Sequence, residues 1–407
     1  MTTIKHVAIV GSGVGGFATV QALRAHGFDG LISLIDPEGE AYDRPPLSKG
    51  FLAGTMTAEE MAFVPSEWYS EHNVEVVPEF VHMLRPREKA LVLRSSSVIR
   101  ADRIVLANGG HARRPVVAGL DDPGIEYLRT AVDSIRLRER LTPGARLVVL
   151  GAGLIGAEVA STATGLGAEV TLIDPVAVPL VSAIGVQLAT LAHGMHEAHG
   201  VRTVCAHPER VERDGALYRV ITMGSHGDEV VHEADVVLVA AGLVPAVDLA
   251  RTGSLVIDDG VLVDAAMRSS VAEIYAIGDV ARRRPAGNVA FRRTEQGDAA
   301  IHDGQTAAAD ITGTTPPRPA AHWFWSDRYG VRLEGTGSMA DPDGVVTRER
   351  PGLMPVEFNL GSHGKLLGAA GIDAGKEIRA ARKLIDSGRS VTAEQLADAT
   401  VDLKKIK

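Results

Sequence analysis

The sequence predicts an α/β fold with two Rossmann-like dinucleotide-binding domains and a small α+β C-terminal domain. Two glycine fingerprints of the form G-x-G-x-x-G, at residues 11–16 and 151–156, carry this prediction. Each follows a short apolar run, as a strand–turn–helix unit requires. A second apolar run follows each fingerprint and ends in an aspartate, Asp36 in one case and Asp174 in the other. Two complete units in one chain suggest two bound dinucleotides.

The glycines of such a fingerprint have different tasks. The first permits a tight turn, the second lets the backbone approach a pyrophosphate, and the third lets the helix pack closely on the strand. Free N–H groups at the helix start favour the negative charge of the pyrophosphate. The two aspartates lie 25 and 23 residues past the first glycines, near the roughly 20 expected for a ribose-binding acid. The residues assigned to the sites are Gly11, Gly13, Val14, Gly15, Gly16 and Asp36 in the first, and Gly151, Gly153, Leu154, Ile155, Gly156 and Asp174 in the second.

The remaining elements follow in chain order. Residues 1–36 predict strand, helix and strand, and an irregular then helical stretch follows. Further strands are expected near 74–77, 90–94, 103–106 and 236–241, and within 271–280, where the strand ends in Gly-Asp. A helix is expected around Arg136, Arg138 and Arg140 before the second fingerprint. The last part of the chain opens with a Trp-rich turn and continues with strands and a helix. The predicted domains are 1–114 with 242–317, then 115–241, then 318–407.

Composition excludes several classes of protein. The chain has 407 residues, of which 45% are hydrophobic and 23% charged, as in ordinary globular proteins. No apolar run reaches the roughly 18 residues of a membrane span. We expect a cytoplasmic location, because the first strand begins at once and no signal-peptide pattern precedes it. The net charge of −9 argues against general nucleic-acid binding.

The single cysteine, Cys205, excludes an intrachain disulfide and a redox-active cysteine pair. It follows a predicted strand, and we expect it to be a buried small apolar residue. A lone redox thiol is the alternative. We assign no metal site.

Several motifs give the chain a wider resemblance. It resembles the FAD-dependent, NADH-dependent ferredoxin reductases that feed bacterial ring-hydroxylating dioxygenases and haem monooxygenases. The resemblance covers nearly the whole chain. Its motifs are YDRPPLSK at 42–49, GAGLIGAE at 151–158, EIYAIGDV at 273–280, WFWSD at 323–327, and two stretches at 364–368 and 379–385.

The resemblance, and not the spacing, implies that FAD occupies the first site and NADH the second. It places Arg44 and Lys49 near the flavin, Asp279 on the ribityl chain, and Trp323, rather than Trp325, against the flavin. It places Glu158 on the nicotinamide side. Ala107 is assigned to FAD and Gly242 to NADH on the same grounds. Simpler explanations stay open: a helix cap for Asp279, a solvated Lys49, a dipole-favourable Glu158 and a tryptophan core.

The implied reaction needs no acid, base or nucleophile from the protein, although Lys49 and Glu158 assist it. NADH delivers a hydride to FAD, and the electrons leave singly to an iron–sulfur ferredoxin. NADH is favoured over NADPH because no Lys or Arg occurs between Asp174 and Arg202, where a 2′-phosphate would need one.

Basic residues suggest how an acidic ferredoxin docks. They are Arg282, Arg283, Arg284, Arg292, Arg293 and Arg328. A solvated charged loop is the alternative. The chain departs from the family at 294–302 and after Asp174, where Val178 and Ser182 stand in place of arginines. Other readings are therefore an FAD/NADH oxidoreductase with oxygen, a quinone or a small metabolite as acceptor, or an FAD-binding protein with a degenerate NADH site.

Overall fold

The computed structural model describes residues 4–224, 226–284, 293–340 and 344–406. The chain divides into two compact units. The first unit comprises Met1–Arg44, Thr57–His111 and Leu243–Arg318, and the second comprises Pro45–Met56, Ala112–Gly242 and Pro319–Lys407. The short segment Pro45–Met56 therefore groups with the second unit, although its neighbours in sequence group with the first. The three-domain division expected from the sequence stays a prediction.

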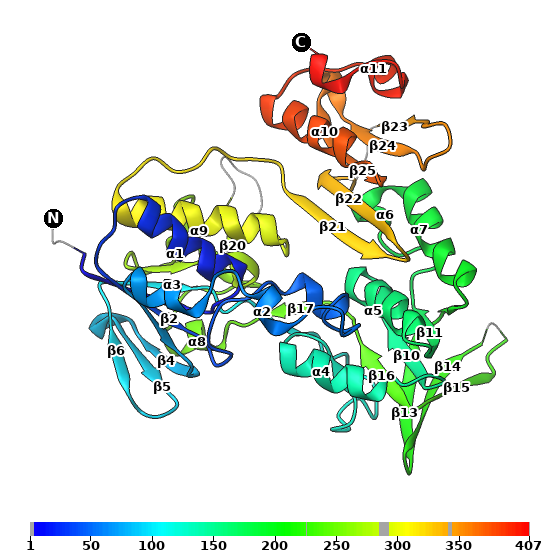
Figure 1. The fold of residues 1–407 in the computed structure, drawn as a ribbon, viewed down its shortest axis with the longest axis horizontal. Helices are drawn as coiled ribbons and strands as arrows, with labels where there is room; N and C mark the ends of the chain where they lie inside the picture. The colour runs from blue at the N-terminus through cyan, green and yellow to red at the C-terminus, as the bar shows by residue number, and fades with distance from the viewer. Residues whose placement is uncertain (1–3, 225, 285–292, 341–343, 407) are drawn as a thin grey trace. The chain divides into compact units, whose positions relative to one another are not determined.

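A parallel five-stranded sheet forms the centre of the first unit, in the order β19-β7-β1-β2-β3 (Figure 1). Its strands are β1 (His6–Val10), β2 (Leu31–Ile35), β3 (Val74–Val77), β7 (Arg103–Leu106) and β19 (Ile274–Ala276). Val10 pairs in register with Ile35 on one side and with Leu106 on the other. The carboxyl ends of three strands therefore meet at one edge, where Gly11 and Asp36 follow them.

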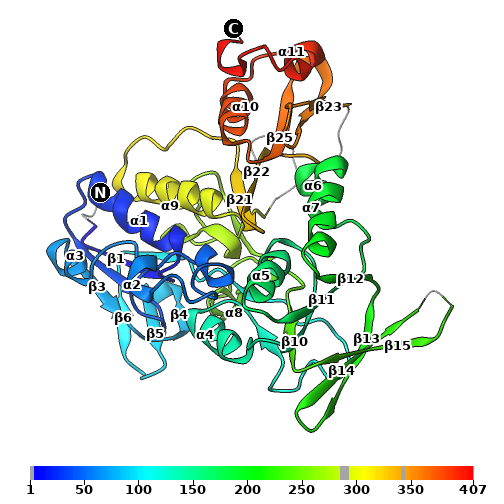
Figure 2. The ribbon, with the colours of Figure 1, turned by 45° about the vertical axis from the view of Figure 1, so that its right-hand side comes forward.

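Helices α1 (Val14–Ala25) and α9 (Gly297–Thr312) lie side by side in the first unit (Figures 1 and 2). Their close approach depends on glycine, because a Cβ on Gly304 would lie 2.7 Å from the Gly15 carbonyl oxygen. The other elements of this unit are short. They are α2 (Ala58–Met61), α3 (Ser66–Glu71), α8 (Asp248–Thr252), β4 (Val81–Arg85), β5 (Ala90–Leu93), β6 (Val98–Arg100), β17 (Leu243–Pro245), β18 (Val261–Val263) and β20 (Ala281–Arg283).

The second unit repeats the parallel arrangement, in the order β12-β11-β10-β16-β9. Its strands and first helices are β9 (Glu126–Tyr127), β10 (Arg146–Leu150), β11 (Glu169–Asp174), β12 (Arg202–Cys205), β16 (Val236–Val239), α4 (Ala131–Arg140) and α5 (Leu154–Gly165). Leu150 pairs with Ile173 and with Val239, as Val10 does with its two partners. The two predicted Rossmann-like units are confirmed.

Two further parts complete this parallel half of the second unit. An antiparallel ribbon of β13 (Pro208–Asp214), β14 (Leu217–Met223) and β15 (Glu229–Ala234) extends beside the sheet (Figure 2). Helices α6 (Val181–Ile184) and α7 (Val186–Ala198) connect β11 to β12. The strand β8 (Gly110–Ala112) lies where the chain enters this unit.

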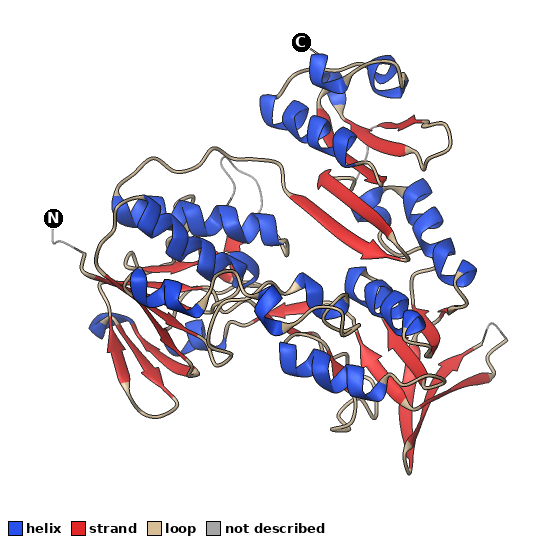
Figure 3. Cartoon of the chain, in the orientation of Figure 1, coloured by secondary structure: helices blue, strands red, loops and turns tan. Residues whose placement is uncertain are grey.

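The C-terminal part of the second unit is an antiparallel sheet with helices (Figure 3). Its order is β21-β22-β25-β24-β23. The elements are β21 (Trp323–Arg328), β22 (Val331–Gly337), β23 (Gly344–Arg348), β24 (Val356–Leu360), β25 (Leu366–Ile372), α10 (Gly375–Ser387) and α11 (Ala393–Ala397). The Trp-rich segment is thus a strand and not the expected turn, because it pairs along its whole length with β22. Among the described residues, we find no helix with the length and apolar character of a membrane span.

The prediction that Cys205 is buried is wrong. Its side chain is exposed, because β12 is an edge strand of its sheet and Cys205 is the last residue of that strand. The thiol lies 3.7 Å from the Pro175 carbonyl oxygen.

His196 joins α7 to the turn after β21. Its Nδ1 and the Tyr329 hydroxyl oxygen are hydrogen-bonded at 2.7 Å, and the residue is 1% exposed. Burial, with a smaller effect from Arg328 and neighbouring histidines, lowers the pKa of His196 to about 3. Burial also raises the pKa of Tyr329 to about 12. The bond therefore joins a neutral imidazole to a protonated phenol.

This arrangement predicts a loss of stability in weak acid. The unfolded chain binds a proton at position 196 below about pH 6.5, whereas the folded protein does not until about pH 3. The stabilisation is complete above pH 6.5 and falls as the pH drops toward 3. Between pH 6.5 and 5, the free energy of unfolding of the wild type should fall by about 2 kcal/mol more than that of His196→Gln. Urea unfolding of this variant, with the exposed His207→Gln as control, measures the difference. Equal pH profiles would contradict the assignment.

Candidate functional site

The first fingerprint forms a turn that only glycine permits. Gly11 has φ +110°, and a Cβ there would lie 2.3 Å from the carbonyl oxygen of Ala107. A Cβ on Gly16 would lie 2.0 Å from the Gly11 carbonyl oxygen. Ala107 follows β7, and its N–H donates to the Val10 carbonyl at 2.8 Å. The strand ends and the helix start are therefore pressed together around this loop.

Asp36 fastens the loop from the neighbouring strand. Its carboxylate accepts the backbone N–H of Ser12 at 2.8 Å and that of Glu38 at 2.9 Å, and the residue is 7% exposed. A carboxylate has about four acceptor positions. Two acceptor positions remain after these bonds. Asp36 can therefore hold the loop in place and also accept hydrogen bonds from a ribose diol.

The start of α1 fits a pyrophosphate. Gly13 is the N-cap, and no side chain caps the helix. The nearest atom to a Cβ built on Gly13 is Nε of Arg44, at 3.8 Å, so the backbone is approachable and a cation lies beside it. Arg44 also pairs with Glu38 at 3.0 Å. This combination of free helix N–H groups and a nearby guanidinium suits a diphosphate.

The second fingerprint has the same geometry. Gly151 has φ +111°, with a built Cβ 2.4 Å from the Ala240 carbonyl oxygen, and a Cβ on Gly156 would lie 1.9 Å from the Gly151 carbonyl oxygen. Asp174 accepts the N–H of Ala152 at 2.7 Å. The helix α5 has no side-chain cap, and a Cβ on Gly153 would meet nothing within 4 Å.

Two further residues extend this second loop. Asp174 also accepts the N–H of Val176 at 2.8 Å. Gly242, just after β16, has φ +98° and accepts the N–H of Arg113 at 2.9 Å. This loop also fits a dinucleotide.

Glu158 and Lys49, far apart in sequence, form an ion pair inside the second unit. The Lys49 Nζ lies 2.8 Å from Glu158 Oε2, and their side chains are 17% and 5% exposed. Ser48 donates to the same oxygen at 2.5 Å, and Ser326 donates to Oε1 at 2.6 Å. Both oxygens of this buried carboxylate are therefore hydrogen-bonded, which its burial requires.

Arg328 extends this network and corrects one prediction. Its Nη2 donates to the Ser326 hydroxyl at 3.1 Å. Because an arginine only donates, the single hydroxyl hydrogen of Ser326 points to Glu158. Arg328 is 4% exposed, so its assignment to a docking surface is wrong. The alternation of β21 turns Ser326 and Arg328 toward α5 together, which is the signal that sequence reasoning missed.

The other flavin-side residues divide between the units. Arg44 and Asp279 belong to the first unit, where Asp279 lies in a short turn directly after β19. Lys49 and Trp323 belong to the second. The rings of Trp323 and Trp325 stack with centroids 4.8 Å apart on one face of β21, and Trp323 also packs against the core of the C-terminal sheet. Their flavin roles stay predictions.

Most of the remaining docking arginines have acidic partners. Arg282 pairs with Asp258 at 2.7 Å, and Arg283 lies 3.4 Å from Asp303. Arg293 is bonded to Glu295 at 2.5 Å. Arg284 is exposed, and Arg292 lies outside the described residues. These pairs offset the positive charge on which the docking prediction depends.

Comparison with known proteins places the chain in a family. Residues 5–304 match the family of pyridine nucleotide-disulphide oxidoreductases, and residues 323–407 match the reductase C-terminal domain. The chain belongs to the pyridine nucleotide-disulphide oxidoreductase family. It is an oxidoreductase, although its single cysteine excludes an intrachain disulfide.

The resemblance to ferredoxin reductases is also confirmed. The chain is 33% identical to rhodocoxin reductase of Rhodococcus erythropolis, over 98% of this chain and 93% of that protein. It is 35% identical to the ferredoxin–NAD(+) reductase component of the anthranilate 1,2-dioxygenase system of Burkholderia cepacia, over 97% and 98%. A crystal structure of a covalent putidaredoxin reductase–putidaredoxin complex matches with a TM-score of 0.91 at 29% identity, over 99% and 98% of the two chains.

The Lys49–Glu158 pair yields a prediction about stability. Lys49→Met removes the cation in direct contact with a buried carboxylate and leaves Arg328 as the remaining cation of the network. It should lower the free energy of unfolding by about 3 kcal/mol. In a Glu158→Gln background the same change should cost little. A double-mutant cycle by urea unfolding measures this coupling. The exposed pair Arg85–Glu88 is the control and should couple by less than about 1 kcal/mol. Additive losses at Lys49 and Glu158 would refute the network.

Proposed function

We propose that this protein is a flavoprotein reductase that transfers a hydride from NADH to FAD and passes electrons singly to a ferredoxin serving an oxygenase. The observation that carries the proposal is the pair of glycine loops, each closed by its own aspartate, in a chain that aligns over nearly its full length with ferredoxin–NAD(+) reductases. Bound FAD supplies the two-electron to one-electron conversion.

The residues of the chain bind and orient the two nucleotides. In the first unit, Asp36 and Asp279 would hold the ribose and ribityl hydroxyls of FAD, and Arg44 with the start of α1 would hold its pyrophosphate. In the second unit, Asp174 and the start of α5 would do the same for NADH. These assignments rest on the loop geometry described above and on the family.

Lys49 and Glu158 would act as a buried electrostatic pair on the nicotinamide and flavin side. Lys49 donates to the Pro45 carbonyl at 3.2 Å as well as to Glu158, so its ammonium position is fixed. A fixed cation is suited to the negative charge that develops on a reduced flavin. The proposal includes a ferredoxin as acceptor and the cytoplasm as location.

Two glycines of the second loop give a matched pair of variants. Gly156→Ala places a methyl group against the Gly151 carbonyl and should destabilise the protein. Gly153→Ala has free space in the structure, so its stability should stay within about 1 kcal/mol of wild type. We expect Gly153→Ala to raise the KM for NADH at least about tenfold, because its methyl group occupies space that the pyrophosphate needs. Thermal unfolding and steady-state kinetics measure the two effects. An unchanged KM in Gly153→Ala would place the nucleotide elsewhere.

Anaerobic stopped-flow mixing tests the reaction itself. NADH should bleach the flavin band at least about tenfold faster than NADPH at equal concentration, because no Lys or Arg occurs between Asp174 and Arg202 in the sequence to accept a 2′-phosphate. The reduced enzyme should then reduce an oxidised [2Fe–2S] ferredoxin faster than it reduces oxygen or benzoquinone. No bleaching by either nucleotide would exclude the proposed function. Bleaching followed by quinone reduction alone would exclude the ferredoxin acceptor.

A further inference from the structure

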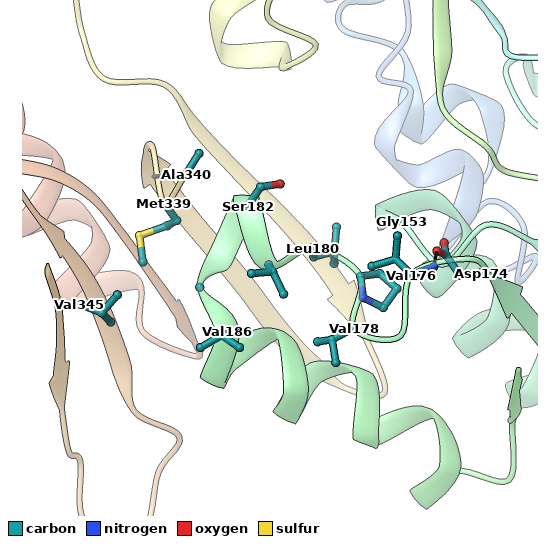
Figure 4. A pocket seen from close by; sticks show the side chains of 13 residues that line it. Gly153, Asp174, Val176, Val178, Leu180, Ser182, Val186, Met339, Ala340 and Val345 are labelled. Atoms are coloured by element: carbon teal, nitrogen blue, oxygen red, sulfur yellow. Dashed lines mark hydrogen bonds between the residues drawn. The ribbon is translucent and has the colours of Figure 1, made fainter. Parts of the chain in front are cut away.

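One pocket of the second unit begins at the NADH loop and ends at the C-terminal sheet. It has a volume of about 670 Å³. Gly153 and Asp174 line one end, Val178 and Ser182 the middle, and Met339 and Val345 the other end (Figure 4). Asp174 is the single charged residue among the described residues that line it. The second Rossmann-like part and the C-terminal part of this unit therefore both line the same pocket.

The pocket presents apolar surface that nothing in the described chain covers. Val176, Val186 and Val345 are 56%, 60% and 45% exposed, and all three line the pocket. Grouped exposed apolar side chains around a concave site mark a place where a ligand is buried.

The end of the pocket that is lined by Gly153 and Asp174 indicates which ligand the pocket would bind. Gly153 and Asp174 belong to the second glycine loop, so a pyrophosphate at the start of α5 and a ribose on Asp174 would lead directly into the cavity. The next group of a dinucleotide beyond that ribose is adenine, whose flat faces are apolar. Val178 and Ser182 occupy the middle, where a cation for a 2′-phosphate is absent from the lining residues.

A buried glutamate of the C-terminal sheet braces the wall of this pocket. Glu357, on β24, is 1% exposed. Its carboxylate lies beside the backbone N–H groups of Gln187 and Leu188 in the first turn of α7, and burial raises its pKa. Its buried Oε2 has no hydrogen-bond partner among the described residues. Gly185 has φ +85°, and a Cβ there would lie 1.9 Å from Glu357 Oε2. The carboxylate thus occupies the space beside the glycine from which α7 starts.

The position of Glu357 matters for the pocket because the start of α7, which Glu357 contacts, also lines the pocket. Gly185 and Val186 belong both to the start of α7 and to the pocket lining. Thr347 of β23 adds a second link, with its hydroxyl 3.3 Å from the Gln187 side-chain oxygen. The start of α7 therefore depends on the C-terminal sheet for its position.

We propose that the C-terminal domain completes the adenosine subsite of the NADH site. Met339 and Val345 form its apolar end, and Glu357 is a positioning residue that holds the α7 turn in place. The subsite accepts an adenosine without a 2′-phosphate. This inference rests on the proposed use of NADH.

Binding of ADP-ribose to the FAD-loaded protein tests the subsite without catalysis. Val345→Asp puts a second carboxylate into the pocket and should raise the Kd for ADP-ribose at least about tenfold. Val231→Asp, at a valine of similar exposure (49%) on β15 outside the pocket, is the matched control and should leave the Kd unchanged. Titration calorimetry measures both. An unchanged Kd in Val345→Asp, or no binding of ADP-ribose by the wild type, overturns the proposal.

Glu357→Ala tests the positioning role, and Glu357→Gln tests its rescue. We expect Glu357→Ala to raise the KM for NADH about tenfold with little change in kcat, and Glu357→Gln to recover part of the loss by keeping one acceptor oxygen. Reduced nicotinamide mononucleotide, which lacks the adenosine, should reduce the flavin of all variants at the wild-type rate. A variant that only loses thermal stability, with NADH and ADP-ribose binding unchanged, overturns the role of Glu357. Failure of the wild type to be reduced by NADH would instead refute the proposed function, so the two failures are distinguishable.

Discussion

The buried carboxylate of Glu158 is the constraint on which the second unit depends. It is the meeting point of three segments distant in sequence: Pro45–Met56 through Ser48 and Lys49, the helix α5 that carries it, and strand β21 through Ser326. An unpaired charge at this depth would cost several kcal/mol, so each partner must be present. Arg328 fixes the direction of the Ser326 hydroxyl. The grouping of Pro45–Met56 with the second unit follows from these bonds, together with the bond from Ser134 to the Leu47 carbonyl.

The two glycine loops are nearly identical in their backbone geometry but differ in their surroundings. In each, an aspartate from the neighbouring strand accepts the N–H of the residue between the first two glycines. The first loop has Arg44 beside it, whereas the second opens into an apolar pocket that the C-terminal sheet helps to form. The same glycine-loop geometry is therefore set in two different environments.

Errors in the sequence-based predictions have a common physical origin. The burial of Cys205 and the exposure of Arg328 were both inferred from residue type. Cys205 is exposed because β12 is the edge of its sheet, and Arg328 is buried because β21 packs against α5. The docking role of the other arginines stays a prediction, although Asp258 and Glu295 lie beside two of them in space. The Trp-rich segment was expected to be a turn because its partner strand could not be recognised from sequence.

The sequence by itself determined the two Rossmann-like units, their glycines and their closing aspartates, because these depend on steric and hydrogen-bonding demands within some 25 residues. It also determined, through one cysteine, that an intrachain disulfide cannot carry electrons here. Tertiary structure alone decided that Lys49 meets Glu158, that Ser326 and Arg328 complete their network, and that the Glu357 carboxylate lies beside the glycine from which α7 starts. The pairs Lys49–Glu158, Ser326–Glu158 and Gly185–Glu357 are each more than 100 positions apart. No local pattern encodes such pairings, since they arise only when whole elements pack and buried charges must find partners.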